Sequence, residues 1–424
     1  MKKITDNLEL FPFEKEKNPE TVSPLPMQYM GSKLRIAPWI IAKIKKNYPK
    51  GSHFYDLFAG TGSVAWMAQQ EGYKIRVNDL QPYSYAVLRS LFVENRRGLT
   101  KLASEIENLS KLEILLSAGR SSAVHILEEE ERFLSSTDIR WQEYRKFSEH
   151  PILVIHRKDI DRLRQANEWN LFLSYYCNTY FGVRQCLELD TLRQFAERLT
   201  ESQKAHLLAS IISVMTYAVS STTHLAQFLK PTNPRAVKAI LDRRRIKIID
   251  MVARRIRALA STPHSTRPED CTNNDFQKAL IGSALNSNWI IYVDPPYFKE
   301  HYSRYYHVLD TLYLYDYPYL TISKLTNNTT IGRYREDRLV SSFGLKSAVK
   351  GALRELLSLC VKSGAIVALS YASTSLMSRA DIEHICKNMG YDVVVEEMIL
   401  QHSGQGQSRG GKVTEFLFIL KEKK

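Results

Sequence analysis

The sequence lacks the features that define several large protein classes. Its five cysteines form no CxxC pair and have no histidine partner at metal-ligand spacing, so a zinc site or a disulfide framework is not expected. The first 20 residues contain no apolar core of signal-peptide length, and the apolar run 39–44 is far too short to cross a bilayer. No repeat period is visible. These absences argue against a secreted or membrane protein and favour the cytoplasm.

The charge balance is strongly basic. The 424 residues have a formal net charge of +14 and a pI near 9.3. An excess of this size favours a polyanionic partner such as nucleic acid, because each Lys or Arg that neutralises a phosphate releases a counterion; solubility alone is the alternative. The length predicts two domains, or one large domain with an insertion.

The order of predicted elements indicates an α/β fold. A strand at 53–57, a glycine turn, a helix at 63–70, a strand at 73–78 and a helix at 80–95 are typical of the start of a doubly wound sheet. Residues 97–265 contain amphipathic helical stretches and almost no strand signal. We therefore predict a polar, mobile leader at 1–26, a sheet domain formed by 27–96 and 266–424, and a helical insertion at 97–265. The later strands of the sheet are expected at 289–293, 365–370, 391–397 and 414–421.

Two features of the first half indicate a nucleotide-like ligand. Gly60 and Gly62 follow the strand in the segment FYDLFAGTG and let the backbone approach a ligand, although the Lys-Ser/Thr pair of a phosphate-binding loop is missing. Asp79 ends the next strand, 17 residues after Gly62, where nucleotide-binding folds place an acidic residue that binds the ribose hydroxyls. A structural turn and a helix N-cap are the respective alternatives.

The sharpest motif is Asp294-Pro295-Pro296-Tyr297, directly after the apolar strand WIIYV. Two consecutive prolines fix φ and remove two donors, so they hold a rigid bend. The Asp294 carboxylate and the Pro295 carbonyl can then accept hydrogen bonds from one planar amine, while the Tyr297 ring can stack on the base that bears the amine.

These motifs resemble those of the Dam-like DNA adenine-N6 methyltransferases. The family's N-terminal aromatic-x-Gly-x-Lys motif is similar to Tyr29–Lys33, its cofactor loop to Asp56–Ser63, and its adenine-binding segment to Asn274–Phe276. Asp294–Tyr297 matches its catalytic motif. The matches occur in the family's order over residues 27–297, whereas the central block is longer and more helical than the recognition region of compact members.

The resemblance implies a Rossmann-like methyltransferase sheet, with the insertion as target-recognition domain. It implies S-adenosylmethionine as cofactor, no metal, and methyl transfer to N6 of an adenine that is flipped out of double-stranded DNA. Lys33 would pair with the cofactor's carboxylate, Asp79 with its ribose, and Asp275 and Phe276 with its adenine. The full predicted cofactor set is Tyr29, Gly31, Lys33, Asp56, Phe58, Gly60, Gly62, Asp79, Asp275 and Phe276. A monomer in a prokaryotic cytoplasm, or encoded by a phage, is expected, with a cognate restriction nuclease or a defence-system subunit as an open partner.

Two basic regions are candidates for DNA contact. Arginines and aromatic residues are interleaved after the catalytic motif, and the run Lys230–Arg257 is strongly basic. A packed aromatic helix and a solvated helix face are the structural alternatives. The predicted DNA-binding residues are His301, Tyr302, Arg304, Arg333 and Arg335, with Arg243, Arg244 and Arg245 in the basic run.

Other functions stay open from the sequence alone. The catalytic motif can hold any planar amine, so N4 of cytosine in DNA and adenine in RNA are alternative acceptors. Asp at position 294 favours adenine within the resembling families. A non-catalytic DNA-binding subunit that kept the fold is the alternative from another class, and the presence of Lys33, Asp79 and Asp294 argues against it.

Overall fold

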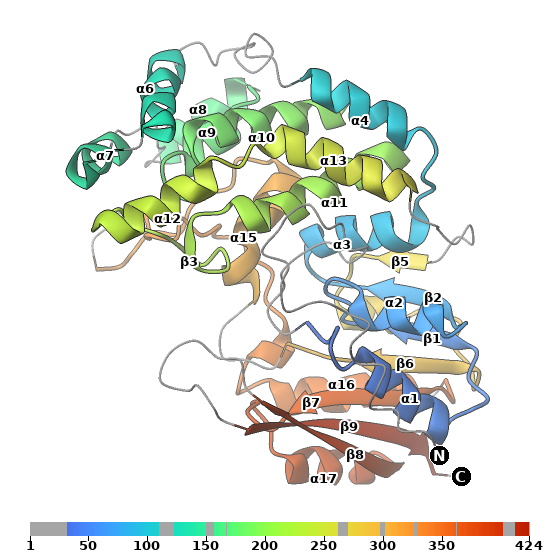
Figure 1. Cartoon of the computed structure of the whole chain (residues 1–424). Helices are drawn as coiled ribbons and strands as arrows, with labels where there is room; N and C mark the ends of the chain where they lie inside the picture. The colour runs from blue at the N-terminus through green and yellow to red at the C-terminus, as the bar shows by residue number, and fades with distance from the viewer. Residues whose placement is uncertain are drawn as a thin grey trace.

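The computed structural model shows a mixed α/β fold built on one seven-stranded sheet (Figure 1). The strand order is β5-β2-β1-β6-β7-β9-β8; the first five strands pair in parallel, and β9 pairs antiparallel to both β7 and β8. The structure describes residues 32–109, 123–136, 138, 140–149, 157–166, 168–261, 270–296, 302–325, 329–361, 363–401 and 412–423. The predicted leader, 1–26, lies outside these residues.

The strands follow the apolar segments of the sequence. They are β1 (His53–Asp56), β2 (Lys74–Asn78), β5 (Asp270–Thr272), β6 (Trp289–Val293), β7 (Ile366–Ala372), β8 (Tyr391–Gln401) and β9 (Lys412–Glu422). The central strand β1 is in register with β2 through Asp56↔Val77 and with β6 through Asp56↔Tyr292. The ends of these three neighbouring strands therefore lie at one edge of the sheet.

Both faces of the sheet are buried, because successive side chains of each strand point to opposite sides. Phe54 and Ile290 belong to the core under α1 (Ala37–Asn47) and α2 (Ser63–Gln70). Tyr55 and Ile291 belong to the core on the other face. The helices of that second face are α14 (Phe276–Leu280), α16 (Val349–Val361) and α17 (Arg379–Asn388).

A large helical unit interrupts the sheet between β2 and β5. The chain leaves β2 through α3 (Pro82–Leu88) and a π-helical turn, η2 (Arg89–Val93), and the next strand of the sheet starts at Asp270. Figure 1 shows the helical unit above the sheet. Its helices are α4 (Leu99–Asn108), α6 (Val124–Ser135), α7 (Trp141–Ser148), α8 (Arg157–Ala166), α9 (Leu171–Tyr176), α10 (Val183–Ala196), α11 (Glu201–Ala218), α12 (Pro234–Arg244) and α13 (Ile248–Ser261), with a small hairpin of β3 (Ser221–Thr223) and β4 (Gln227–Phe228).

A later helix, α15 (Tyr302–Leu314), also packs into the helical unit. The Tyr176 hydroxyl donates to Thr311 Oγ1 at 3.2 Å, and the Tyr175 hydroxyl donates to the Pro318 carbonyl at 3.0 Å. The predicted boundary assigned this segment to the sheet domain by its place in the sequence. Its contacts show that residues 302–320 share a core with the helical unit.

The strand predictions agree with the structure to within a few residues, and the strand predicted at 289–293 matches β6 fully. The basic run, a candidate for DNA contact with a solvated helix face as the alternative, lies mostly on two helices, α12 and α13. The short strand β5 was not predicted. Within the described part of the chain, no helix is long and apolar enough to cross a membrane.

A buried carboxylate joins three helices of the helical unit. Glu130 of α6 is 1% exposed and accepts hydrogen bonds from the first backbone N–H groups of α10, from Val183 at 2.9 Å and Arg184 at 3.0 Å. The guanidinium of Arg244, at the end of α12, lies 3.8 Å from the same carboxylate. A β-carbon at Gly182 would lie 2.3 Å from Glu130 Oε1, so only glycine leaves room for this carboxylate.

We predict that Glu130→Ala strongly destabilises the helical unit. The substitution leaves the buried Arg244 guanidinium and two N–H groups of α10 without this partner, and breaking a buried ion pair costs about 3–5 kcal/mol. Urea titration of Glu130→Ala, of the control variant named below and of the wild type would measure the free energy of unfolding. The matched control is Glu128→Ala, which removes an exposed carboxylate from the same helix; equal stability of the two variants would contradict this account.

Candidate active site

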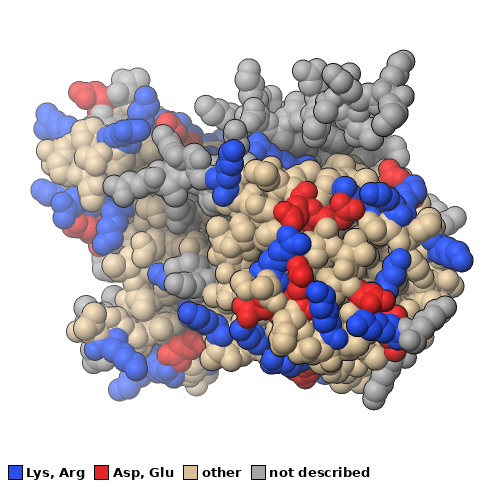
Figure 2. All heavy atoms as spheres, turned by 90° about the horizontal axis from the view of Figure 1, so that it is seen from below, with Lys and Arg blue, Asp and Glu red and all other residues tan. Residues whose placement is uncertain are grey.

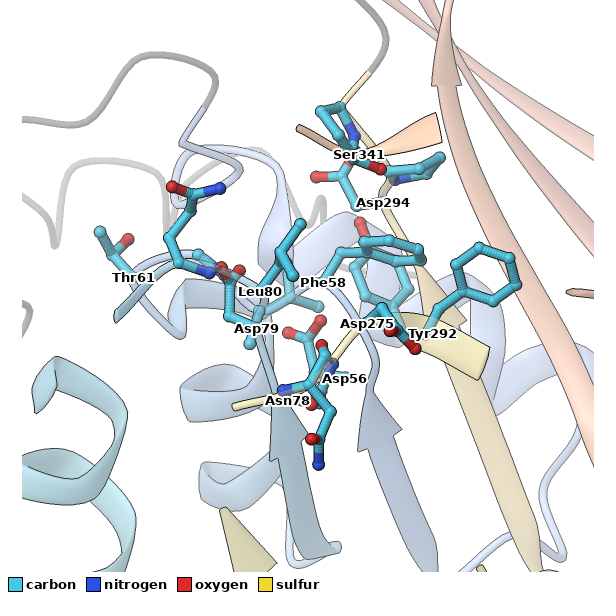
Figure 3. Close-up of a pocket in the computed structure, with 18 of the residues that line it drawn as sticks. Asp56, Phe58, Thr61, Asn78, Asp79, Leu80, Asp275, Tyr292, Asp294 and Ser341 are labelled. Carbon is cyan, nitrogen blue, oxygen red and sulfur yellow. Dashed lines mark hydrogen bonds between the residues drawn. The ribbon is translucent and has the colours of Figure 1, made fainter. Parts of the chain in front are cut away.

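A pocket of about 370 Å³ lies where β1, β2 and β6 end. Figure 3 shows side chains from these strand ends and from Ser341 gathered around one space. The structure thus brings together most of the residues predicted for cofactor binding and catalysis, although they are spread over more than 260 positions of the sequence. The predicted residues that line the pocket are Lys33, Asp56, Phe58, Gly60, Asp79, Asp275, Phe276, Asp294, Pro295 and Pro296.

The glycine turn after β1 has the backbone conformation that the sequence predicts. Gly60 and Gly62 both have positive φ angles, 53° and 78°, a region that other residues rarely adopt. Gly62 is the N-cap residue of α2, and a β-carbon there would come within 2.8 Å of the Phe92 ring. The turn can therefore bring backbone close to a ligand, while α2 begins directly behind it.

Asp79 connects this turn with the end of β2. Its two carboxylate oxygens accept hydrogen bonds from the backbone N–H groups of Gly60 and Gln81, both at 2.8 Å. Burial raises the pKa of Asp79 to about 6, while these two hydrogen bonds oppose the shift. Asp79 is not the N-cap of α3, because Gln81 occupies that position. The ribose-binding role predicted for Asp79 stays a prediction, but its carboxylate lies in the pocket wall.

Asn78 is a structural residue of the pocket that the sequence analysis missed. Its amide donates to the Leu57 carbonyl at 3.1 Å and to the Asn274 carbonyl at 3.0 Å, while its oxygen accepts from Thr272 Oγ1 at 2.8 Å. Asn78 thus joins the ends of β1, β2 and β5. The signal in the sequence was a polar residue at the end of a buried strand, next to Asp79.

Phe58 and Phe276 line one wall of the pocket, and the fully buried Phe343 packs behind them. The rings of Phe58, Phe276 and Phe343 pack with centroid distances of 5.4–6.2 Å. Asp275 caps the short helix α14 by accepting the backbone N–H of Lys278 at 2.7 Å, and this bond fixes the entry of Phe276 into the cluster. Phe343 was not predicted, because it lies far from the motifs in sequence.

The segment Leu339–Ser342 lines the mouth of the same pocket and was also missed. Leu339 and Val340 are 43% and 44% exposed, unusual for large apolar residues at a pocket. The Gln81 side chain donates to the Leu339 carbonyl at 3.3 Å, which ties this segment to the turn after β2. A ligand in the pocket would cover these apolar side chains.

Asp294 begins the rigid Pro-Pro segment and shares its surroundings with two other charged groups. Lys33 Nζ lies 3.6 Å from Asp294 Oδ1 and 2.7 Å from Glu415 Oε1 of β9. The resemblance predicts that Lys33 pairs with the cofactor's carboxylate. The structure shows the ammonium already between two protein carboxylates, so a third would have to share it.

Burial makes the carboxylates of the pocket difficult to ionise. It raises the pKa of Asp294 to about 7; Lys33 opposes this shift and the charge of Glu415 adds to it. Burial, followed by the charges of Asp294 and Asp79, raises the pKa of Asp56 well above its usual range. One buried oxygen of Asp56 and one of Asp294 have no hydrogen-bond partner. The pocket therefore favours a ligand with donors or positive charge at this point.

Several predicted residues lie outside the described part of the chain. These are Tyr29 and Gly31 of the N-terminal motif, the catalytic Tyr297, and His301; Tyr302 begins α15, but its side chain is not described. Of the predicted catalytic motif, the structure therefore shows Asp294, Pro295 and Pro296.

The predicted DNA-binding arginines differ in their accessibility. Arg335 is 3% exposed and pairs with Asp316 at 2.7 Å and with Asp337 at 2.9 Å. Arg244 is 2% exposed beside Glu130. These two guanidinium groups are therefore not accessible to DNA, which corrects the prediction. Each forms ion pairs with carboxylates of the protein itself.

The remaining arginines are divided between interior and surface. Arg333 is buried and has a positive φ of 49°, so its predicted DNA contact is also corrected. Arg304 is half-buried, with its Nε donating to the Tyr334 hydroxyl at 3.1 Å. Arg243 and Arg245 are exposed on and just after α12, so their charges are available to a partner.

Comparison with known proteins finds a family match over part of the chain. The model of the D12 class N6 adenine-specific DNA methyltransferases matches residues 29–216, a region that includes the glycine turn and Asp79 and ends before Asp294. Over these residues the chain is similar to that class, in agreement with the resemblance seen in the sequence. The mostly parallel seven-stranded sheet is consistent with a methyltransferase fold.

Three relatives of the chain are named as type II methyltransferases. M.FokI of Planomicrobium okeanokoites is 25% identical over 86% of the chain and 47% of its own length. M.CviAII of Paramecium bursaria Chlorella virus 1 is 24% identical over 92% of the chain and 97% of its own length. M.NlaIII of Neisseria lactamica is 23% identical over 93% and 99%. The chain thus spans about half of M.FokI and nearly all of the other two.

The raised pKa of Asp294 predicts a pH dependence of stability for the ligand-free protein. An acid whose pKa is higher in the folded than in the unfolded chain stabilises the fold when protonated, and this stabilisation is lost as pH rises. For Asp294 the window runs from its ordinary value of 3.8 to about 7. The free energy of unfolding of Asp294→Asn, relative to wild type, should therefore increase between pH 4 and 7 and level off above.

Urea titrations at several pH values would measure this difference. The matched control is Asp392→Asn, which removes an exposed carboxylate from β8 and should not reproduce the trend. A difference between Asp294→Asn and wild type that stays constant from pH 4 to 8 would contradict the burial of an unfavourable charge at this position.

Proposed function

We propose that the chain is a site-specific DNA methyltransferase that transfers a methyl group from S-adenosylmethionine to N6 of a flipped-out adenine in DNA. The observation that supports it most is one shared pocket: the rigid segment Asp294–Pro296 opens into the same space as the glycine turn and Asp79. The family match supports adenine in DNA as the acceptor, and the names of the relatives support methyl transfer as the reaction.

The pocket fits S-adenosylmethionine in charge and in shape. A buried Asp56 oxygen without a hydrogen-bond partner, and the Asp294 carboxylate, whose Oδ1 has a 3.6 Å ionic contact with Lys33, favour the positive charge of a sulfonium or ammonium group. Phe58 and Phe276, with Phe343 packed behind them, offer an apolar, aromatic wall for an adenine. Asp79, across the glycine turn, would hold the ribose hydroxyls. We propose these residues as the cofactor site.

The mechanism depends chiefly on positioning. S-adenosylmethionine supplies an activated methyl group on sulfur. Asp294 and the Pro295 carbonyl would accept hydrogen bonds from the two N6–H groups of the adenine, turning the nitrogen lone pair toward the methyl group. The Asp294 carboxylate would then take the one proton that N6 loses when the methyl group is attached. Tyr297 would stack on the extruded base. The two prolines fix the backbone, so both acceptors are in place before the base arrives.

The architecture supports a division of labour between the sheet and the helical unit. We propose that the seven strands form a Rossmann-like methyltransferase sheet, whose carboxyl-end crevice binds the cofactor. Residues 97–265 would form the target-recognition domain, and α15 would connect it to the catalytic motif. Because relatives are named type II methyltransferases and modification methylases, we also propose that the enzyme protects DNA against a partner nuclease.

The exposed basic face of α12 is our candidate for phosphate contact. Its exposed cations are Arg235, Lys238 and Arg243, continued by Arg245 and Lys247, and Asp242 is the acidic residue among them. By contrast, Figure 2 shows the molecule from below with Lys and Arg interspersed with Asp and Glu, so that face has no large area of one sign. The surface charge therefore favours DNA contact on the helical unit.

Asp294→Ala should abolish methyl transfer and leave cofactor binding measurable. The substitution removes one of two acceptors for the adenine amine, and losing a preorganised group of this kind lowers kcat about 100- to 1000-fold or more. Transfer of labelled methyl groups to DNA, followed by identification of the modified base, would measure the rate. Binding of labelled S-adenosylmethionine by equilibrium dialysis is the control.

The outcomes separate the possible acceptors. N6-methyladenine made by wild type alone supports the proposal, whereas N4-methylcytosine, or label in RNA only, overturns its acceptor. Near-normal turnover by Asp294→Ala would contradict the mechanism. Cofactor binding without transfer to any nucleic acid would indicate a non-catalytic subunit.

Charge reversal of the α12 face should weaken DNA binding without affecting the cofactor. We expect the Arg243→Glu/Arg245→Glu variant to reduce the slope of log K against log salt concentration by about 1 for each lost phosphate contact. Fluorescence anisotropy with labelled duplex DNA would measure it. The control is Lys101→Glu on the exposed side of α4, which reverses one charge instead of two; a loss in the control at least half as large as in the double variant would show that the effect is one of net charge only.

A further inference from the structure

Glu415 of β9 is a buried charge at the pocket that no sequence motif indicated. It is 2% exposed and pairs in register with Ala372, the last residue of β7. Because β9 runs antiparallel to β7, the beginning of β9 reaches the edge where the parallel strands end. The antiparallel strand β9 thus brings a carboxylate to the edge of the sheet where the pocket lies.

The contacts of Glu415 connect it to Asp294 through one lysine. Its Oε1 accepts hydrogen bonds from Lys33 Nζ at 2.7 Å and from Ser370 Oγ at 2.6 Å. The same ammonium lies 3.6 Å from Asp294 Oδ1. Lys33 and the Glu415 side chain are 7% and 3% exposed, and Asp294 is 15% exposed. The short bonds are therefore on the Glu415 side, and the longer contact faces the catalytic carboxylate.

This arrangement constrains a side chain that is otherwise flexible. A lysine has four rotatable bonds, and one long contact with Asp294 would not hold its ammonium in place. The Glu415 carboxylate fixes the ammonium, while Ser370 fixes the carboxylate. Since a charge-assisted bond of 2.7 Å is strong and buried here, the position of the positive charge beside Asp294 is set by β7 and β9.

We propose that Glu415 is a positioning residue for methyl transfer, which holds the Lys33 ammonium beside Asp294 and thereby orients the carboxylate that receives the adenine amine. The role in methyl transfer rests on the proposed function. The contacts among Glu415, Lys33 and Asp294 do not depend on it. Glu415 does not touch the amine in this account; it acts through Lys33.

The groups around Asp294 make the proposal testable by titration. Lys33 comes from the segment before α1, Glu415 from β9, Asp56 from the end of β1, and Tyr292 from β6 itself. Neutralising Glu415 removes a negative charge, so it should lower the pKa of Asp294; neutralising Lys33 removes a positive charge, so it should raise it. A residue with only a packing role would not produce opposite shifts.

The test combines Glu415→Gln with Lys33→Met in the full chain. Asp side chains are labelled with ¹³C at Cγ, and the signal of Asp294 is assigned by its loss in Asp294→Asn. The titration midpoint of that signal should move to lower pH in Glu415→Gln and to higher pH in Lys33→Met. The control, Glu422→Gln, removes an exposed carboxylate from the far end of β9 and should leave it unchanged.

Methyl transfer by the same variants completes the test. We expect kcat to fall about 10- to 100-fold in Glu415→Gln, since small displacements of a reacting group cost this much, with little change in the KM for DNA. Ser370→Ala keeps all three charges and should lower kcat about threefold or more, a second readout if Glu415→Gln folds poorly.

Two results would overturn the positioning role of Glu415. An unchanged Asp294 titration in Glu415→Gln, or normal kcat in both Glu415→Gln and Ser370→Ala, overturns the positioning role. The titration needs no methyl acceptor, so wild-type protein that titrates as expected but transfers no methyl group would refute the proposed function and leave the contact between these charges established.

Discussion

The parallel pairing of β1 with β2 and β6 is the constraint on which the candidate site depends. Each strand ends in polar residues: Asp56 for β1, Asn78 and Asp79 for β2, and Asp294 for β6. Parallel registration places these ends at one edge, and the buried apolar layers on both faces hold the strands in that registration. This arrangement buries several carboxylates in one pocket, and burial raises the pKa values of Asp56, Asp79 and Asp294.

The features that could be predicted from sequence are those encoded by neighbouring residues. The apolar run WIIYV followed by Asp-Pro-Pro predicts both β6 and its rigid exit, and the glycine turn predicts the positive φ angles of Gly60 and Gly62. The ends of consecutive strands meet at one edge of any parallel sheet, so the joint pocket of these motifs was also predictable.

The features that could not be predicted depend on partners distant in sequence. Lys33 and Glu415 are 382 positions apart, and nothing near either residue indicates the other. In the sequence Arg244 is one of three consecutive arginines with the same predicted DNA contact. In the helix its side chain points into the protein, where its guanidinium lies beside the Glu130 carboxylate. Arg335 was expected to contact DNA because it follows a tyrosine-rich segment; Asp316 and Asp337 neutralise it inside the protein.

The most direct test of the central claim is a crystal structure of the chain with sinefungin, a cationic analogue of S-adenosylmethionine, and a short DNA duplex that contains its target. The account predicts the analogue's adenine against Phe58 and Phe276 and its ammonium near Asp294. It also predicts a flipped adenine whose N6 lies within hydrogen-bond distance of Asp294 and the Pro295 carbonyl. An analogue bound elsewhere, or an extruded base that does not reach Asp294, would contradict it.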